Sequence, residues 1–208
     1  MTLPLTRFID DVDEDWLHQT RDAGSVAWDI ETTGLDWAAS RVATCQLATR
    51  DRVALVQLRG RQIPKHLSQL LADAGVTKVF HHAPFDLRFM AHAWAVRPVN
   101  VACTKVAAKI VEPGLLEPKA YSLQSLLRRH LGVQIDKGQQ VSDWTNPNLS
   151  DAQVRYAVND VTHLEPLLEV LLACAANQGT SELVSASYAY LPTRVQLDLS
   201  GAGDVFLY

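Results

Sequence analysis

The sequence predicts an α/β protein built on a mixed sheet with flanking helices. Three apolar or alternating segments, residues 25–30, 41–49 and 52–58, are typical of strands, and the polar Arg50-Asp51 pair predicts a hairpin between the last two. From residue 77 onward, short apolar segments alternate with helical patterns. Three antiparallel strands followed by strand–helix alternation fit a mixed sheet with helices on its faces.

The first half of the chain contains three predicted helices around these strands. Residues 11–21 form a short polar helix, and residues 63–74 form a second one with leucines at helical spacing. Residues 77–81 are a fourth strand. The helix over residues 84–95 follows it, with Pro84 in its first turn, where proline is tolerated.

The second half ends in a helical run over residues 153–169. Ser150 is the expected N-cap of this run. Pro166 should kink the run or end its first half. The segments that precede it are a strand at 99–103, helices at 104–111 and 122–131, and a largely irregular stretch at 132–148.

Composition and cysteine usage bound the class of protein. With 208 residues, 48% of them hydrophobic, the chain is expected to form a single domain over residues 1–208. The net charge of −4 argues against a protein that coats long nucleic acid. The three cysteines are far apart and lack the spacing of a metal site, which indicates a reducing cytoplasm. The sequence has no apolar stretch of ~20 residues and no signal peptide, so a cytoplasmic protein that does not bind membranes is expected.

Four carboxylates and one phenol are expected to meet from three separate segments. Asp29 and Glu31 lie two apart at the end of a strand, so their side chains face the same side. Asp86 lies where the fourth strand gives way to a helix. Tyr156 and Asp160 lie one helical turn apart on one face. Oxygen ligands without a thiolate suit Mg²⁺ or Mn²⁺, and two such ions catalyse phosphodiester hydrolysis.

The order and spacing of these residues resemble a known family. Glu31 is followed after 55 residues by Asp86, and Asp86 after 74 residues by Asp160. This pattern resembles the DEDD superfamily of 3′–5′ exonucleases, in the subclass with tyrosine in the third motif. The sister subclass has a histidine five residues before the last aspartate, where this chain has Arg155.

The resemblance extends over about residues 22 to 206. Residues 29–35 and 80–86 are similar to the first and second exonuclease motifs, and residues 137–161 are similar to ribonuclease D. Residues 103–109 and 190–206 are similar to the short nanoRNase C type diribonucleotidases. At 208 residues, the chain is expected to lack the accessory helical RNA-binding domain of ribonuclease D.

This resemblance implies a ribonuclease H-like mixed sheet, the DnaQ-like exonuclease fold, and two divalent ions, Mg²⁺ or Mn²⁺. Asp29 is expected to bridge both ions. Glu31 and Asp160 would hold the ion that binds the attacking water, and Asp86 the ion at the leaving oxygen. Tyr156 is a poor general base at neutral pH, with an unperturbed pKa near ~10, and is expected to orient the nucleophile.

Three functions fit the sequence to different degrees. The first is a 3′–5′ exoribonuclease that hydrolyses short RNA, down to diribonucleotides, to 5′-mononucleotides. The second is a ribonuclease D-like exonuclease that trims longer RNA, or DNA, at its 3′ end. The third is a catalytically silent nucleic-acid-binding scaffold, which the presence of all five motif residues disfavours. The resemblance of the C-terminal residues favours short RNA substrates, with single-stranded DNA as a further candidate.

Four residues are candidates for substrate binding. Leu35, after the turn at Gly34, would wedge between terminal bases, or be a core leucine. His81 would contact the terminal ribose or the scissile phosphate, or be a buried hydrogen-bonded histidine. Lys137 and Gln140 would bind a 5′ phosphate, or belong to a solvated loop.

The apolar end of the chain predicts an assembly. Residues 197–208 include Val205, Phe206, Leu207 and Tyr208, and such a segment commonly marks an interface. The resembled group forms closed rings, so a ring-like homo-oligomer with a confined active site is expected.

Overall fold

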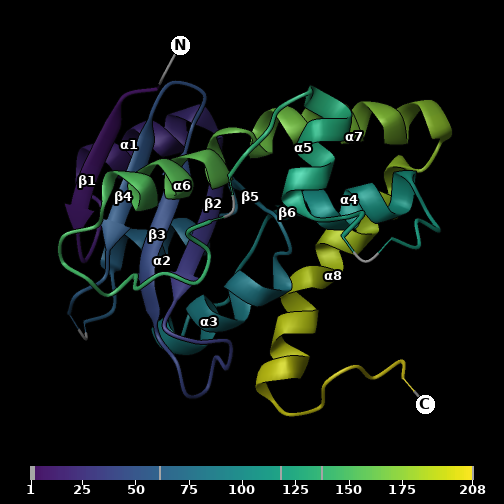
Figure 1. Cartoon of the computed structure of the whole chain (residues 1–208). Helices are drawn as coiled ribbons and strands as arrows, with labels where there is room; N and C mark the ends of the chain where they lie inside the picture. The colour runs from purple at the N-terminus through teal and green to yellow at the C-terminus, as the bar shows by residue number, and fades with distance from the viewer. Residues whose placement is uncertain (1–2, 61, 118, 137, 208) are drawn as a thin grey trace.

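The protein is built on a mixed sheet with helices on both faces (Figure 1). The computed structural model describes residues 3–60, 62–117, 119–136 and 138–207. Within these residues the sheet has six strands in the order β1-β4-β3-β2-β5-β6. The strands are β1 Leu5–Ile9, β2 Ser25–Thr32, β3 Val42–Ala48, β4 Val53–Gln57, β5 Thr77–Phe80 and β6 Val101–Cys103.

The pairing of the strands confirms the predicted mixed sheet. β2, β3 and β4 are antiparallel neighbours, while β5 pairs parallel with β2 and β6 parallel with β5. β1 pairs parallel with β4 at the sheet edge, and the sequence analysis missed it. Three of its five residues are exposed, so its sequence lacks the apolar pattern of a buried strand.

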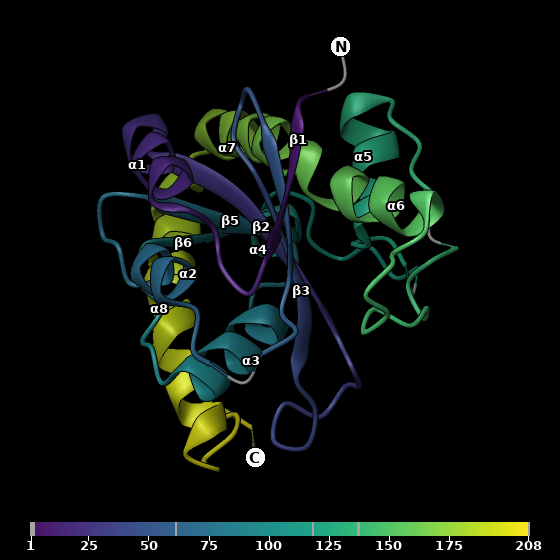
Figure 2. The same cartoon turned by 90° about the vertical axis from the view of Figure 1, so that its left-hand side faces the viewer.

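The helices divide between the two faces of the sheet. Figure 2 shows α1, α2 and α3 on one side and α5 and α6 on the other. α8 packs on α3, α4 and the edge strand β6, and α7 packs on α4. The helices are α1 Glu14–Ala23, α2 Lys65–Leu71, α3 Pro84–Trp94, α4 Thr104–Val111, α5 Leu123–Leu131, α6 Asp151–Thr162, α7 Leu164–Gln178 and α8 Ser181–Leu199.

The helical run predicted over residues 153–169 is two helices. Ser150 caps α6 in a full capping box with Gln153, which confirms the predicted N-cap. The run breaks at His163, and α7 starts directly after it. Pro166 lies in the first turn of α7, where its missing N–H leaves no intrahelical bond unmade. The expected interruption is therefore present just after Asp160.

The C-terminal helix α8 was not assigned from the sequence. It contains Pro192 in its interior, and its apolar residues do not concentrate on one helix face. Beyond α8, Phe206 packs on Tyr190 with ring centroids 5.9 Å apart, yet it stays 72% exposed. No helix in the described part of the chain is both long and apolar enough to cross a membrane.

The two faces of β2 differ in chemistry. Val26, Trp28 and Ile30 point into an apolar core with α1, α2 and α3. The alternate residues Asp29 and Glu31 therefore point to the opposite face, which α6 covers. This alternation places two carboxylates inside the layer between the sheet and α6.

Candidate active site

The candidate site lies at the end of β2 on the face covered by α6. Asp29 pairs across from Gln46 of β3, and Glu31 pairs across from Thr44. After Glu31 the register shifts, so that Thr32 pairs with Val42. Such a bulge bends a strand and re-aims the side chains beside it. It lies directly next to the two carboxylates.

Helix α6 supplies the third carboxylate. One oxygen from each of Asp29, Glu31 and Asp160 lies within 4.8 Å of the other two. Asp160 is only 4% exposed, and the other two are half-buried. Three hard oxygen donors held so closely in a partly buried place repel one another unless a cation lies between them. The donor set fits a divalent ion such as Mg²⁺ or Mn²⁺.

Asp86 joins the cluster from the other side. It lies in the first turn of α3 and is 3% exposed. Burial, and next the nearby Asp29 carboxylate, raise the pKa of Asp86 well above its usual range. Asp86 is not one of the three residues within 4.8 Å of one another, but Asp29 is its charged neighbour. Asp29 is thus a neighbour both of Glu31 and Asp160 and of Asp86.

Tyr156 lies one turn before Asp160 and is held in a buried setting. It is 5% exposed and packs on Trp144, with ring centroids 5.8 Å apart. Burial raises the pKa of Tyr156 far above its usual range, and the charges of Asp160 and Glu31 add to this. The phenol also hydrogen-bonds with Asp160. The hydroxyl is therefore protonated at neutral pH, where it can orient a water but not deprotonate one.

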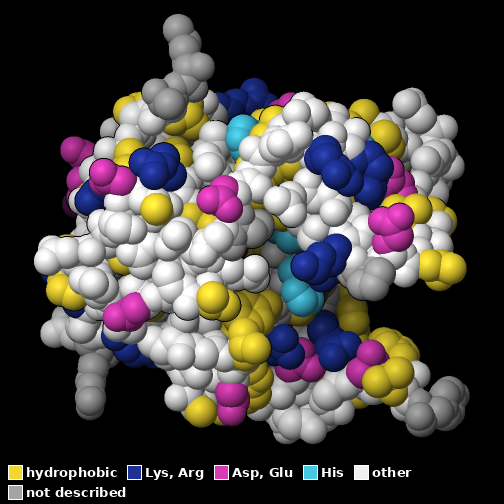
Figure 3. Space-filling model, in the orientation of Figure 1, with side chains coloured by type: hydrophobic (Ala, Val, Ile, Leu, Met, Phe, Trp, Pro, Cys, Tyr) yellow, Lys and Arg dark blue, Asp and Glu magenta, His cyan; other side chains and the backbone are white. Residues whose placement is uncertain are grey.

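A cavity of about 780 Å³ opens onto these side chains. Figure 3 shows a hollow in one face of the molecule, with histidine and basic side chains around it. The cavity brings together segments that are far apart in sequence: residues 29–35 from β2 and the turn after it, 81–86 from the start of α3, Leu123 from α5, 140–142 from the loop before α6, and Tyr156 and Asp160 from α6.

Three of the four candidate substrate-binding residues line this cavity. Leu35 is 85% exposed, so it is not a core leucine. It follows Gly34, where a Cβ would lie 2.5 Å from the Ser40 Oγ. His81 lines the cavity with its Nδ1 2.8 Å from the Thr104 Oγ1. Gln140 also lines the cavity, from the loop before α6. Lys137 lies outside the described residues.

His82 is a cavity residue that the sequence analysis did not propose. It adopts a left-handed backbone conformation with φ +68°, which is uncommon for a residue other than glycine. Partial burial, followed by the charges of Lys105, Arg88 and Lys109, lowers the pKa of His82 to about 4. The ring is therefore neutral at pH 7. Its place beside His81 in the second motif was the available signal.

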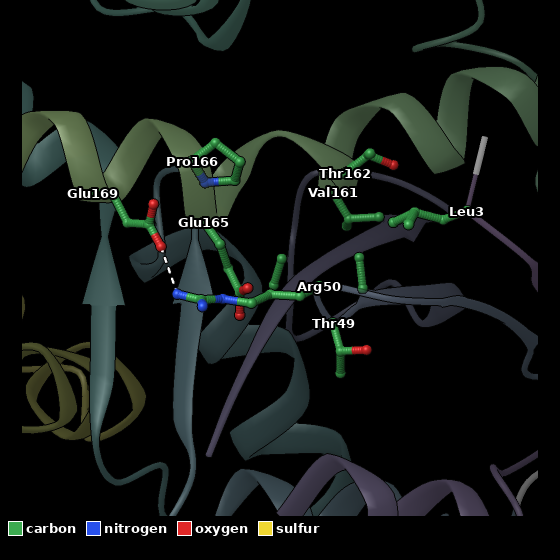
Figure 4. A pocket seen from close by; sticks show the side chains of 10 residues that line it. Leu3, Thr49, Arg50, Val161, Thr162, Glu165, Pro166 and Glu169 are labelled. Atoms are coloured by element: carbon green, nitrogen blue, oxygen red, sulfur yellow. Dashed lines mark hydrogen bonds and ion pairs between the residues drawn. The ribbon is translucent and has the colours of Figure 1, made fainter. Parts of the chain in front are cut away.

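A second, smaller pocket of about 320 Å³ lies further along the same sheet face (Figure 4). Arg50 and Glu169 form an ion pair across it at 2.7 Å. Glu165 accepts a hydrogen bond from the Ser25 hydroxyl at 2.7 Å. The charged groups of this pocket are thus paired with protein groups, and the larger cavity is the stronger candidate for a metal-dependent site.

The sequence profile of a 3′–5′ exonuclease family matches residues 8–173. The chain belongs to this family. A solved structure of Brucella melitensis NrnC superposes with a TM-score of 0.90 at 32% identity, covering 99% of this chain and 98% of that one. The same protein has been solved with bound pGG, at a TM-score of 0.90, and with bound Mg²⁺, at a TM-score of 0.89.

Ribonuclease D from Gluconacetobacter diazotrophicus is 35% identical over 147 residues, which are 70% of this chain and 36% of that protein. The chain thus spans about a third of the length of the curated relatives it matches. The protein is a DEDD 3′–5′ exonuclease of the NrnC type. Its mixed sheet is the DnaQ-like exonuclease fold, also seen in Escherichia coli ribonuclease D at a TM-score of 0.79 and 21% identity. The family uses divalent metal ions, and the carboxylate cluster fits that requirement.

Proposed function

We propose that this exonuclease hydrolyses short RNA, down to diribonucleotides, from the 3′ end to 5′-mononucleotides, with two divalent ions, Mg²⁺ or Mn²⁺. One observation carries the proposal: carboxylates from β2, α3 and α6 converge at one cavity of about 780 Å³. Bound there, two ions would lower the pKa of a water and stabilise the leaving oxygen. The proposed ligands are Asp29, Glu31, Asp86 and Asp160.

Each proposed ligand has a place that suits its role. Asp29 neighbours Glu31 and Asp160 and also acts on Asp86, which suits a ligand shared by two ions. Glu31 and Asp160 lie with it on the side of Tyr156, whose protonated hydroxyl would orient the attacking water. Asp86 lies in the first turn of α3, where the helix dipole favours an anion. It would serve the leaving-group side.

Short RNA is the proposed substrate because of the cavity and the NrnC likeness. The NrnC structure bound to pGG covers this chain along its whole length. Leu35 projects from the cavity wall without a core role, so it is free to wedge between the terminal bases. His81 would contact the terminal ribose or the scissile phosphate. Gln140, with Lys137, would bind the 5′ phosphate.

Trimming of longer RNA is the second candidate function. The likeness to ribonuclease D covers 70% of this chain and supports the same chemistry on another substrate. Single-stranded DNA belongs to the same alternative. An exonuclease without length preference would give similar kcat/KM on a dinucleotide and a decanucleotide.

A homo-oligomer with a confined site, built from a single domain over residues 1–208, completes the proposal. Val205, Phe206 and Leu207 are 53%, 72% and 78% exposed at the end of the chain, which supports a role at an interface. Sedimentation tests the assembly, because a 23.0 kDa monomer at micromolar concentration rules it out. Deletion of residues 197–208 tests the part played by the tail: an intact assembly after deletion excludes it. A cytoplasmic location stays a prediction.

The deciding experiment is a time course on 5′-labelled RNAs of two to about ten nucleotides, with single-stranded DNA of the same lengths alongside. We expect cleavage in Mg²⁺ or Mn²⁺, none in excess EDTA, and the highest kcat/KM on the dinucleotide. Asp29→Asn should be inactive. Glu169→Gln in the second pocket is the matched control and should keep full activity. Activity in EDTA, or an active Asp29→Asn variant, contradicts the metal site, while equal rates at all lengths contradict the substrate.

A further inference from the structure

Two buried polar side chains of β3 lie behind the carboxylates of β2. Gln46 pairs across from Asp29, and Thr44 pairs across from Glu31. Side chains directly opposite each other in an antiparallel pair point to the same face, with Cβ atoms about 4.5–5.5 Å apart. Gln46 also pairs with Leu55 of β4, which shares a hydrophobic cluster with Val154, Tyr156 and Ala157 of α6 and so lies on the α6 face. The carboxamide of Gln46 is therefore enclosed between Asp29, Leu55 and α6.

Both ends of this carboxamide lack a partner. Gln46 has no exposed surface, and neither its Oε1 nor its Nε2 has a hydrogen-bond partner among the residues that the structure describes. The same holds for the Thr44 Oγ1. Burying an unpaired amide is unfavourable, so such groups are rare in native proteins. An apolar residue of equal length would avoid this loss.

Another buried glutamine in the same layer shows the contrast. Gln153 accepts a hydrogen bond from the Ser150 N–H and donates to the Ser142 Oγ and the Asp143 carbonyl. It is fully paired because it caps α6 and fastens the preceding loop. Gln46 has no comparable structural task, and its one polar cross-strand neighbour is a candidate metal ligand.

We propose that Gln46 is a positioning residue for the catalytic carboxylates, donating from its Nε2 to the Asp29 carboxylate when the cation site is filled. The inference rests on the proposed metal site. A carboxylate that binds a cation through some lone pairs is held in orientation by a hydrogen bond to the others, and loss of such a partner weakens metal affinity. The carboxamide Oε1 then accepts a hydrogen bond from a water in the site. Gln46 touches no substrate and acts through Asp29.

The test variant is Gln46→Met, which keeps the side-chain length and removes both polar ends. Mn²⁺ affinity is measured by the electron paramagnetic resonance signal of free Mn²⁺, and the unfolding midpoint is measured in EDTA. We expect Mn²⁺ affinity to fall about 10- to 100-fold. The unfolding midpoint in EDTA should stay unchanged or rise, because the removed groups had no partner. Gln46→Leu should behave in the same way, and it replaces Gln46→Met in the test if that variant folds poorly.

Leu55→Met on the next strand is the matched control and should keep wild-type Mn²⁺ affinity. Wild-type affinity in both Gln46 variants overturns the inference. A lower unfolding midpoint of the Gln46 variants in EDTA also overturns it, because Gln46 would then stabilise the metal-free fold. An equal loss of Mn²⁺ affinity in Leu55→Met overturns it as well, because the loss would not be specific to Gln46. Asp29→Asn distinguishes failure of the proposed metal site from failure of the proposed role of Gln46. If Asp29→Asn binds Mn²⁺ like the wild type, the proposed metal site is wrong. If Asp29→Asn loses Mn²⁺ affinity but Gln46→Met does not, only the role of Gln46 is wrong.

Discussion

The two faces of strand β2 carry opposite kinds of burial. On the face toward α1, α2 and α3, Trp28 is fully buried and lies 6.1 Å from Phe80 and 6.2 Å from Trp94 by ring centroids. On the face toward α6, the alternate residues Asp29 and Glu31 lie close to Asp160. Neighbouring residues of β2 therefore have different surroundings: the apolar residues contribute to the stability of the fold, and the carboxylates contribute to the proposed metal site.

This difference shows how one strand separates stability from function. Apolar burial on one face stabilises the sheet in every condition, while clustered carboxylates on the other face weaken the metal-free protein by mutual repulsion. Burial, and next the charge of Asp29, raise the pKa of Asp86, so part of that shift comes from the repulsion. If the comparison holds, substitutions on the two faces will change different measurements, and the following predictions test this.

The largest expected effect is on the carboxylate face. Asp29→Asn should lower kcat by on the order of 10³-fold or more, because Asp29 is the proposed shared ligand and its loss would remove several kcal/mol of transition-state stabilisation. The unfolding midpoint in EDTA should not fall, since the amide replaces a charge that repels Asp86. Single-turnover kinetics and thermal unfolding measure the two quantities. A variant that is both inactive and strongly destabilised would erase the distinction between the faces.

The next effect is on the apolar face. Trp28→Ala should lower the free energy of unfolding by about 3–5 kcal/mol, as expected for a large aromatic side chain removed from a core. Activity per folded molecule should change far less than in Asp29→Asn. Urea unfolding and active-site titration with Mn²⁺ give the two readouts. A fall in kcat per folded molecule as large as that of Asp29→Asn would show that the faces are not independent.

A smaller effect is expected at Tyr156. Tyr156→Phe should lower kcat by on the order of 10²-fold if the buried hydroxyl orients the attacking water as proposed. Mn²⁺ affinity should change little, since the phenol is protonated and is not a proposed ligand. Tyr190→Phe, on α8 beside Phe206, is the matched control and should be fully active. Wild-type turnover in Tyr156→Phe would assign the ring to packing alone.

Local patterns in the sequence predicted much of the frame. α4 has the bounds predicted for it, and the Ser150 cap was evident from its sequence. β1 was missed because it is a strand only through its pairing with β4, and its own residues are mostly exposed. α8 was missed because its apolar residues do not concentrate on one face.

The candidate site shows the same division. The spacing of Asp29 and Glu31 predicted a shared face, and α6 brings Asp160 to it. The parallel pairing of β5 with β2 brings Asp86 beside Asp29, and no local pattern encodes that contact. The unpaired amide of Gln46 was also beyond a sequence, since hydrogen-bond satisfaction depends on the packed neighbours. Motifs thus predict which residues meet at the candidate site, and packing decides how their charges are balanced.

The smallest effect is expected at Asp86, and it should have opposite signs with and without metal. In the metal-free fold, burial and the charge of Asp29 raise the pKa of Asp86. Between the usual value of about 4 and that raised pKa, the folded state therefore binds more protons than the unfolded state. The free energy of unfolding then falls as pH rises through this window. Asp86→Asn cannot ionise, so in EDTA at pH 8 it should unfold at a higher temperature than the wild type, where a gain of about 1 kcal/mol corresponds to about 2–4 °C at this length. The gain should shrink toward zero as pH falls to about 4. In Mg²⁺ the order should reverse, because the variant has lost a proposed ligand.

Asp143→Asn is the matched control: hydrogen bonds from Thr145 lower the pKa of that exposed carboxyl, so its replacement should give no gain. Calorimetric scans across pH measure the unfolding midpoints of the wild type and both variants. An Asp86→Asn midpoint below that of the wild type in EDTA at pH 8 would mean that other protein groups already stabilise the charged carboxylate of Asp86.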